Sequence, residues 1–206
     1  MPFNKVLLLI GYLALSLVSC AKQSGVCYFP RKVGMHWEYL CIIAQPSSNN
    51  ETFERKTYTI QEFIKTKNKI YNRFVICVDG TKMRDTIVFL DRIDDKGVYI
   101  ILEDGSMGET EVQTFTFPFR VGVSGSYVTS SDNKFVKWSV DSIGTVEVNR
   151  IKYYDCLHIS TVVLNTMIDT HAQSTSVLAP GVGKVKSIYT KRNGLKVTES
   201  LIRFNR

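Results

Sequence analysis

Apolar and polar residues alternate with a period of two through most of the chain after residue 20. Met35, Trp37 and Tyr39, for example, alternate with polar neighbours, which is typical of a β-strand that buries one face. No segment after residue 20 carries a sustained apolar period of 3.6 residues, so helices should be few. The alternation therefore predicts an all-β protein.

Short polar turns separate the strand-like runs. Such runs span residues 53–65, 70–78, 86–93, 98–102, 153–163, 171–178, 185–190 and 195–204. Asn193-Gly194, between the last two runs, is a strong signal for a tight hairpin turn. Short turns between successive strands imply an antiparallel meander, and about ten strands at this spacing favour a curved half-barrel or barrel-like sheet.

The middle of the chain is less regular. Phe115, Phe117 and Phe119 are predicted to share one face of a strand, with Thr114 and Thr116 on the other. The glycine-rich segment 121–126 is not assigned to a strand, and two shorter alternations follow at 136–140 and 146–148.

The first 20 residues resemble a bacterial lipoprotein signal. Residues 6–18 are an apolar stretch, too short to span a bilayer, which takes about 20 residues, but suited to a signal-peptide helix. Leu17-Val18-Ser19 precedes Cys20 as small and apolar residues precede the acylated cysteine of a lipobox. We expect a signal peptide over 1–19, lipidated Cys20 and a tether over 20–27, and one β domain over 28–206. An ordinary signal cleaved near Ala21 and an uncleaved anchor are the alternatives.

Lipidation implies a membrane location. One acyl chain holds a protein only marginally at a membrane, whereas two or three hold it stably. Ala21, directly after the cysteine, is not the acidic residue that retains some lipoproteins at the inner membrane. By resemblance to such lipoproteins, we expect the periplasmic face of the outer membrane.

Basic residues gather in the last third of the chain. Residues 21–149 contain 16 basic and 16 acidic residues, whereas residues 150–206 contain 9 basic and 3 acidic ones. Lys184 and Lys186 belong to this basic region, which is predicted either to face anionic lipid or an acidic partner, or to be a solvated strand face. The secretion signal argues against nucleic acid as a partner.

The sequence gives no pattern typical of a catalytic or metal site. His36, His158 and His171 are isolated, and neither a Gly-x-Ser-x-Gly nor a Cys-x-x-Cys motif is present. The four cysteines after Cys20 allow three disulfide pairings, and buried free thiols are the alternative. We therefore predict no cofactor, no metal and no enzymatic activity.

Aromatic residues supply the best candidates for a binding surface. They pack as a core or, if the barrel is not filled, line a pocket for a hydrophobic ligand. The candidate ligand or partner surface consists of Trp37, Tyr39, Phe115, Phe117, Trp138, Lys184 and Lys186. Pro180, Gly181 and Gly183 are predicted to form a structural bend between strands, because proline fixes φ and glycine permits a positive φ.

Several short motifs resemble a known family. They are Tyr28-Phe29-Pro30 with Gly34 and Trp37-x-Tyr39, residues 145–148 leading into 154–157, and residues 178–186. These motifs resemble the TapB-like family, uncharacterised bacterial envelope lipoproteins, and more distantly the half-barrels of the LolA and LolB lipoprotein carriers. The resemblance implies a β-barrel-like domain in the cell envelope. Val177-Leu178 departs from it, because the family has an aromatic residue before Ala-Pro-Gly.

Two functions follow from these observations. The leading hypothesis is a non-enzymatic lipoprotein, anchored at the outer membrane, that binds a partner protein or an envelope component. The alternative is a half-barrel carrier for a hydrophobic ligand or lipid, motivated by the aromatic strands and the basic last third.

Overall fold

The computed structural model describes residues 26–46, 51–66, 68–79, 84–104, 108–129, 134–165 and 170–205. The predicted signal peptide, Cys20 and the first part of the tether lie outside these residues. No helix within the described ranges is long and apolar enough to cross a membrane.

The described residues form strands and one short 3-10 helix, so the predicted all-β class is confirmed. The elements are η1 (Val26–Tyr28), β1 (His36–Ala44), β2 (Glu51–Thr66), β3 (Lys69–Asp79), β4 (Arg84–Ile93), β5 (Gly97–Asp104), β6 (Gly108–Thr116), β7 (Ser124–Thr129), β8 (Lys134–Val148), β9 (Ile151–Asn165), β10 (Thr170–Ala179), β11 (Gly183–Lys191) and β12 (Lys196–Asn205). β7 was not predicted, because its serine and glycine residues carry no apolar alternation.

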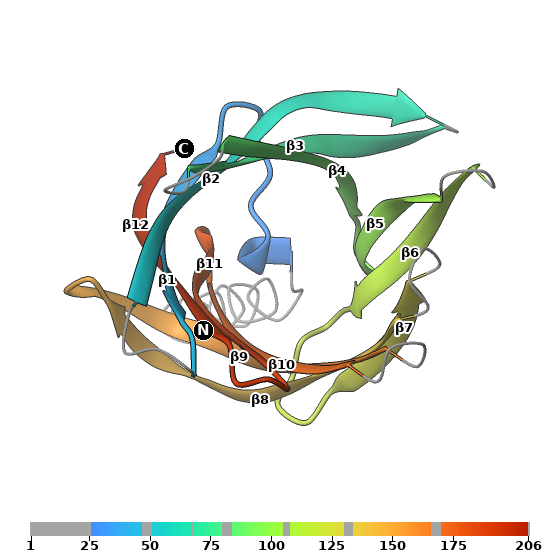
Figure 1. Cartoon of the computed structure of the whole chain (residues 1–206). Coiled ribbons are helices and arrows are strands. Elements are labelled where there is room, and N and C mark those ends of the chain that lie inside the picture. Colours follow the sequence, from blue (N-terminus) through green and yellow to red (C-terminus); the bar gives the residue numbers. More distant parts are fainter. Residues whose placement is uncertain are drawn as a thin grey trace, which may run out of the picture.

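The twelve strands form one antiparallel sheet in which strands consecutive in the chain pair with each other, except β6 and β7. β1 also pairs with β12, with Trp37 opposite Phe204 and Ala44 opposite Lys196. The free edges of the sheet belong to β6 and β7, so the ring of strands is nearly closed (Figure 1). Alternate residues of every strand therefore face a common interior.

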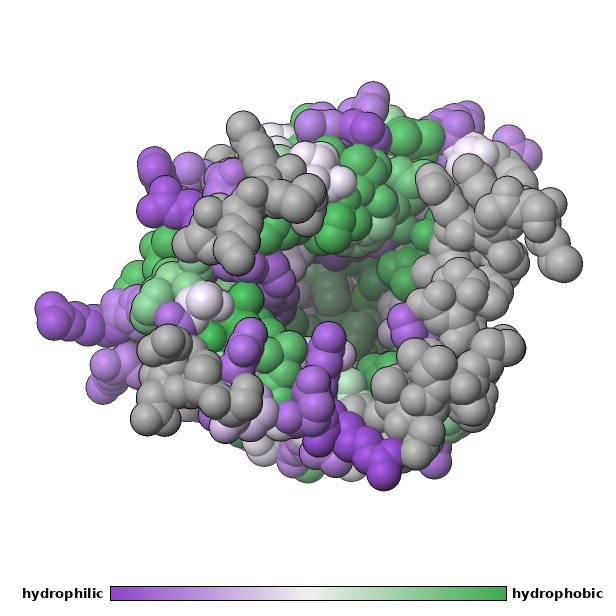
Figure 2. Space-filling view, in the orientation of Figure 1, coloured by the Kyte–Doolittle hydropathy of each residue, from purple (hydrophilic) through white to green (hydrophobic). Residues whose placement is uncertain are grey.

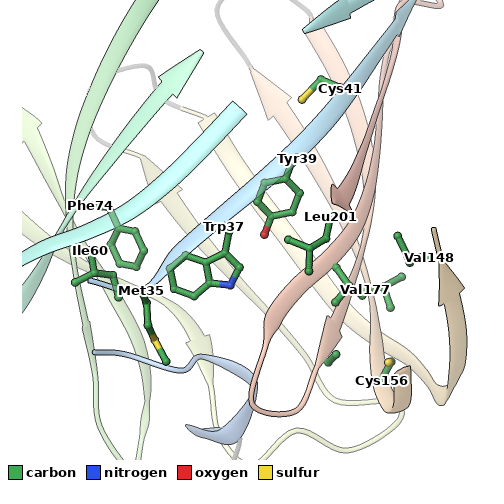
Figure 3. Packing of buried hydrophobic residues seen from close by; sticks show 12 residues of the cluster. Met35, Trp37, Tyr39, Cys41, Ile60, Phe74, Val148, Cys156, Val177 and Leu201 are labelled. Atoms are coloured by element: carbon green, nitrogen blue, oxygen red, sulfur yellow. The ribbon is translucent and has the colours of Figure 1, made fainter. Parts of the chain in front are cut away.

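The hairpin of β8 and β9 packs against β12. Two register shifts within residues 140–146 of β8 are β-bulges, which bend a strand and increase its twist. The pairing of β11 with β12 stops at Ser200, and beyond it the Asn149 side chain at the hairpin turn donates a hydrogen bond to the Leu201 carbonyl at 2.7 Å. Figure 3 shows Val148, Cys156 and Val177 near Leu201, in the same buried cluster.

The N-terminal segment 26–35 fills part of the interior. η1 lies inside the ring of strands (Figure 1, blue). The Tyr28 hydroxyl donates to the carbonyl oxygen of Asp155 in β9 at 2.8 Å, and the Gly181 N–H donates to the carbonyl of Cys27 at 2.7 Å. The segment is thereby hydrogen-bonded to the wall at β9 and at the turn between β10 and β11.

Aromatic rings pack around Phe29 of this segment. Its ring centroid lies 5.9, 6.2 and 6.0 Å from those of Phe115, Phe117 and Phe119. The Trp138 ring lies 5.2 Å from Phe115 and extends the cluster to β8. Aromatic pairs at such distances add to the stabilisation from buried area.

The strand predicted through Phe119 is wrong beyond Thr116, where β6 ends. Pro118 follows directly and has no N–H to continue a strand ladder. Phe115 and Thr114, predicted to face opposite sides, both line the interior, because a register shift between β5 and β6 lies next to them.

Gly125 lets β7 lie against β8, and this gives a test of the fold. A Cβ at Gly125 would lie 2.7 Å from Cζ2 of the buried Trp138 ring, so we expect Gly125→Ala to cost about 1–3 kcal/mol of unfolding free energy. Gly144→Ala is the matched control. Its Cβ would meet nothing within 4 Å, and we expect a change between zero and a gain of about 1 kcal/mol. Urea unfolding measures both, and equal effects would contradict the packing of β7.

Candidate functional site

A cavity of about 360 Å³ lies inside the barrel, between the strands and the N-terminal segment. Its volume is within the range of small-molecule sites, about 300–1,000 Å³. Figure 2 shows a hollow in the middle of the molecule, with hydrophobic residues on its wall and hydrophilic ones around it. The barrel is therefore not completely filled by its own side chains.

Aromatic rings from several strands make one part of the cavity wall apolar. Phe74 of β3 stacks on Phe89 of β4 with centroids 4.8 Å apart, and Trp37 of β1 lies 6.2 Å from Phe74. Phe29 and Phe115 contribute from the N-terminal segment and β6. Inward positions of adjacent strands face the same side of the sheet, which explains why residues far apart in the sequence meet here.

A second recess of about 470 Å³ continues along β10, β11, β12 and β2. It shares Tyr58, Ser176 and Lys184 with the apolar cavity. Its remaining wall is rich in hydroxyl and charged groups, from Ser174, Ser187, Tyr189, Lys56, Lys191 and Glu199. The barrel interior is therefore amphipathic, and Lys184 stands where the two parts meet.

Glu199 is the centre of a charged cluster at this junction. Glu199 is 8% exposed, and its carboxylate accepts hydrogen bonds from Lys184 Nζ at 2.6 Å and from Lys56 Nζ at 2.8 Å. The Ser187 hydroxyl donates a third bond at 3.0 Å. Burial alone would raise the pKa of Glu199, but the two ammonium groups outweigh it and lower the pKa to about 2.

Lys184 is held by aromatic rings as well as by Glu199. Its Nζ lies 5.0 Å from the Tyr39 ring centroid and 4.9 Å from that of Tyr58, distances at which a cation is attracted to a ring. Burial disfavours the charged form, but Tyr58 and Glu199 raise the pKa of Lys184 above its usual value. The pKa of Lys56 is also raised: hydrogen bonding to Glu199 overcomes the burial. One carboxylate thus faces two ammonium groups that remain protonated.

A second ion pair connects the N-terminal segment to the wall. Arg31 Nη2 lies 2.6 Å from Oδ2 of the buried Asp91 in β4. Asn72 Nδ2 donates to Asp91 Oδ1 at 2.7 Å, and the Arg31 guanidinium lies 4.8 Å from the Phe74 ring centroid. Asp91 is therefore neutralised and hydrogen-bonded, so the apolar part of the cavity gains no net charge from this pair.

A third charged cluster, around Glu111, does not line the cavity. Glu111 accepts from Arg92 Nε at 2.9 Å and from the Tyr71 hydroxyl at 2.7 Å, and it also pairs with Lys69. Burial would raise the pKa of Glu111, but these donors lower it to about 2. The cluster joins β3, β4 and β6, and we assign it a structural role.

The predicted site residues fall into three sets. Those that line the cavity are Trp37, Tyr39, Phe115 and Lys184. Trp138 and Phe117 pack in the aromatic cluster beside it. Lys186 lines neither recess, because a bulge in β11 places Lys184 opposite Leu178 and Lys186 opposite Val177, consecutive residues that face opposite sides of the sheet.

The loop of Pro180, Gly181 and Gly183 connects β10 to β11. Gly181 and Gly183 have φ values of 72° and 91°, which only glycine adopts readily. A Cβ at Gly183 would lie 3.6 Å from Cδ of Pro30, and the Trp37 indole donates to the Val182 carbonyl at 2.6 Å. The loop therefore packs closely against both the N-terminal segment and β1.

Sequence reasoning did not identify Glu199, Lys56, Arg31 or Asp91 as members of the site. Glu199 carried a usable signal, because it stands midway between Val197 and Leu201 in an alternating strand. A charged residue at an apolar position of the alternation indicates a buried group with a partner. Its partners Lys56 and Lys184 carried no such signal.

The described residues contain no group of three or more His, Cys, Asp or Glu side chains placed to hold a metal ion. Cys41, Cys77 and Cys156 are free thiols. The Cys41 thiol lies 3.9 Å from Glu199 Oε1, and burial raises its pKa to about 11, which leaves it protonated and unreactive at neutral pH.

Comparisons with known proteins identify a shared fold. No protein-family model and no curated protein matches the chain. A solved structure from Bacteroides fragilis, described as an exported protein with a YmcC-like fold, superposes with a TM-score of 0.55 at 13% identity, covering 86% of this chain and 98% of that one. The fold is therefore YmcC-like. A Parabacteroides distasonis protein described as a lipoprotein superposes with a TM-score of 0.49 at 9% identity over the same shares of both chains.

The lowered pKa of Glu199 makes stability depend on pH. A carboxylate with a pKa of 4.5 when unfolded and about 2 when folded stabilises the protein above pH 4.5, and this contribution is lost as the pH falls toward 2. The shift corresponds to roughly 3 kcal/mol. We expect Glu199→Gln to lose correspondingly less unfolding free energy than wild type between pH 5 and pH 2 in urea titrations. The contribution of Glu111 is the same in both proteins and cancels from the comparison. Equal losses of unfolding free energy in wild type and Glu199→Gln would contradict the lowered pKa of Glu199.

Proposed function

We propose that this protein is a lipid-anchored protein of the cell envelope that binds an amphipathic small molecule inside its barrel without transforming it. One observation carries the proposal: the apolar cavity continues into a polar, charged recess through shared residues. A ligand with an apolar and a polar end matches both parts at once. Of the two functions expected from the sequence, this observation favours ligand binding.

The charges at the junction support binding rather than catalysis. General acid–base catalysis works best with a group whose pKa is near the working pH. Here the pKa of Glu199 is far below neutrality, and those of Lys184 and Lys56 are raised above their usual values. Burial also raises the pKa of the Tyr39 hydroxyl, which remains protonated. Each of these groups keeps one protonation state at neutral pH.

The N-terminal segment supports an orientation at the membrane. Cys20 precedes η1 by six residues, which reach at most about 22 Å when extended. The barrel end that holds η1 is therefore directed toward the membrane, and the turn between β11 and β12, where Lys191 and Leu195 line the polar recess, lies at the other end. The description of the Bacteroides fragilis protein as exported supports an envelope location, and we place this protein at the periplasmic face of the outer membrane.

Ligand binding is testable with a neutral apolar fluorophore such as N-phenyl-1-naphthylamine and purified Cys20→Ala protein. We expect saturable binding that Thr161→Trp weakens at least tenfold, because Thr161 lines the cavity and tryptophan would fill it. Val162→Trp is the matched control, since the neighbouring residue of β9 lies outside the cavity. Unchanged binding by a folded Thr161→Trp protein would place the fluorophore elsewhere and contradict the proposal.

The anchor is testable by labelling cells with radioactive palmitate. We expect label in wild type and none in Cys20→Ala, because the acyl chains attach at that residue. Cys27→Ala, which leaves Cys20 intact, should label like wild type and remain in the membrane fraction. Equal labelling of wild type and Cys20→Ala would refute the anchor.

A further inference from the structure

We infer that the ligand carries an anionic head group, a carboxylate or a phosphate, bound beside Lys184 and Lys56, with a single alkyl or acyl chain in the aromatic part of the cavity. This inference rests on the proposed function and specifies its ligand class.

The polar recess carries more positive than negative charge. Its wall contains three lysines and one glutamate, Lys56, Lys184, Lys191 and Glu199. Glu199 bonds to two of the ammonium groups but neutralises only one positive charge. The recess therefore has an excess of positive charge, which complements an anion.

The two lysine side chains are more accessible than the carboxylate that they bind. The side chains of Lys184 and Lys56 are 26% and 23% exposed, whereas that of Glu199 is 10% exposed. Each ammonium group has three donors. Glu199 accepts one hydrogen bond from each, and the Tyr58 hydroxyl accepts a second from Lys184 at 3.5 Å, so among the described residues Lys184 keeps one donor and Lys56 two. The lysines thus offer donors to the recess, while the glutamate is turned toward its partners.

Lys184 lies at the junction of the apolar cavity and the polar recess. It lines both parts of the interior, so an anion bound to it would have its chain directed past Tyr39 and Tyr58 toward Trp37 and Phe74. The charges in the apolar part, Arg31 and Asp91, neutralise each other. An uncharged chain therefore fits that part, and a charged group fits only the junction.

The surrounding hydroxyl groups fit an oxyanion as well. Ser174, Ser176 and Tyr189 line the same recess. Hydroxyl donors and ammonium groups together are typical partners of carboxylate and phosphate oxygens. A cationic head group would instead meet like charges.

Competition with the bound fluorophore tests the inference in the Cys20→Ala protein. The competitors share a ten-carbon chain and differ in head group: decanoate, decyl phosphate, decanol and decylamine, all below their micellar concentrations. We expect decanoate or decyl phosphate to bind at least tenfold more tightly than decanol, and decylamine to bind most weakly. The stronger of the two anions identifies the carboxylate or the phosphate as the head group.

Three variants locate the anion. Lys184→Gln should weaken anion binding at least tenfold and weaken decanol binding much less. Glu199→Gln should tighten anion binding, because it removes the negative charge that competes for the lysines. Lys186→Gln, on the same strand but outside both recesses, should change neither. If Lys184→Gln fails to fold, Lys56→Gln serves instead, since it keeps the pair of Lys184 and Glu199.

The outcomes separate this inference from the proposed function. Two results would overturn the inference of an anionic head group and leave the apolar cavity as a binding site. They are decanol binding as tight as that of the anions, and anion binding that neither Lys184→Gln nor Lys56→Gln weakens. Failure of every competitor and of the fluorophore would overturn the proposed function and the inference with it. Tighter binding of decylamine than of decanoate would reverse the charge preference and refute the inference alone.

Discussion

The pairing of β1 with β12 is the interaction on which the rest of the molecule depends. The meander of antiparallel strands is interrupted between β6 and β7, so its two six-stranded halves form one nearly closed ring only because β1 pairs with β12. The ladder from His36 and Asn205 to Ala44 and Lys196 provides this closure. It also brings β2 and β11 onto either side of β1 and β12, and these strands carry the charged junction.

The interior of the barrel is partly filled by the N-terminal segment and partly left as a cavity. A barrel of this size is too wide for its own inward side chains, and here the N-terminal segment occupies part of the space. Phe29 and Tyr28 complete a close-packed aromatic end, and Arg31 joins that segment to Asp91 in the wall. The unfilled space is bounded by aromatic rings on one side and by Glu199 with its lysines on the other, so it has an apolar end and a charged end.

The local features of the fold were predictable from sequence, whereas the site was predictable only in part. Alternation identified the inward positions of Trp37 and Tyr39, because period two is a property of each strand alone. The bond between Lys56 and Glu199 joins residues 143 positions apart and depends on closure of the ring. Lys184 and Lys186 looked equivalent at a spacing of two, and only the bulge in β11 separates them. The resemblance to TapB-like lipoproteins stays a prediction, while the barrel-like fold it implied is confirmed.

The free edges of the sheet have a topological consequence. They belong to β6 and β7, which are consecutive in the chain, whereas the strands at the two ends of the series pair with each other. Among the described strands, no ladder joins β6 to β7, and the polypeptide between Thr116 and Ser124 is the direct covalent link across that seam. Cleavage there would separate no paired strands and would leave two six-stranded halves held together by the hydrogen bonds between β1 and β12. The barrel thus consists of two six-stranded halves that are joined covalently on one side, by the segment between β6 and β7, and by the hydrogen bonds of β1 and β12 on the other.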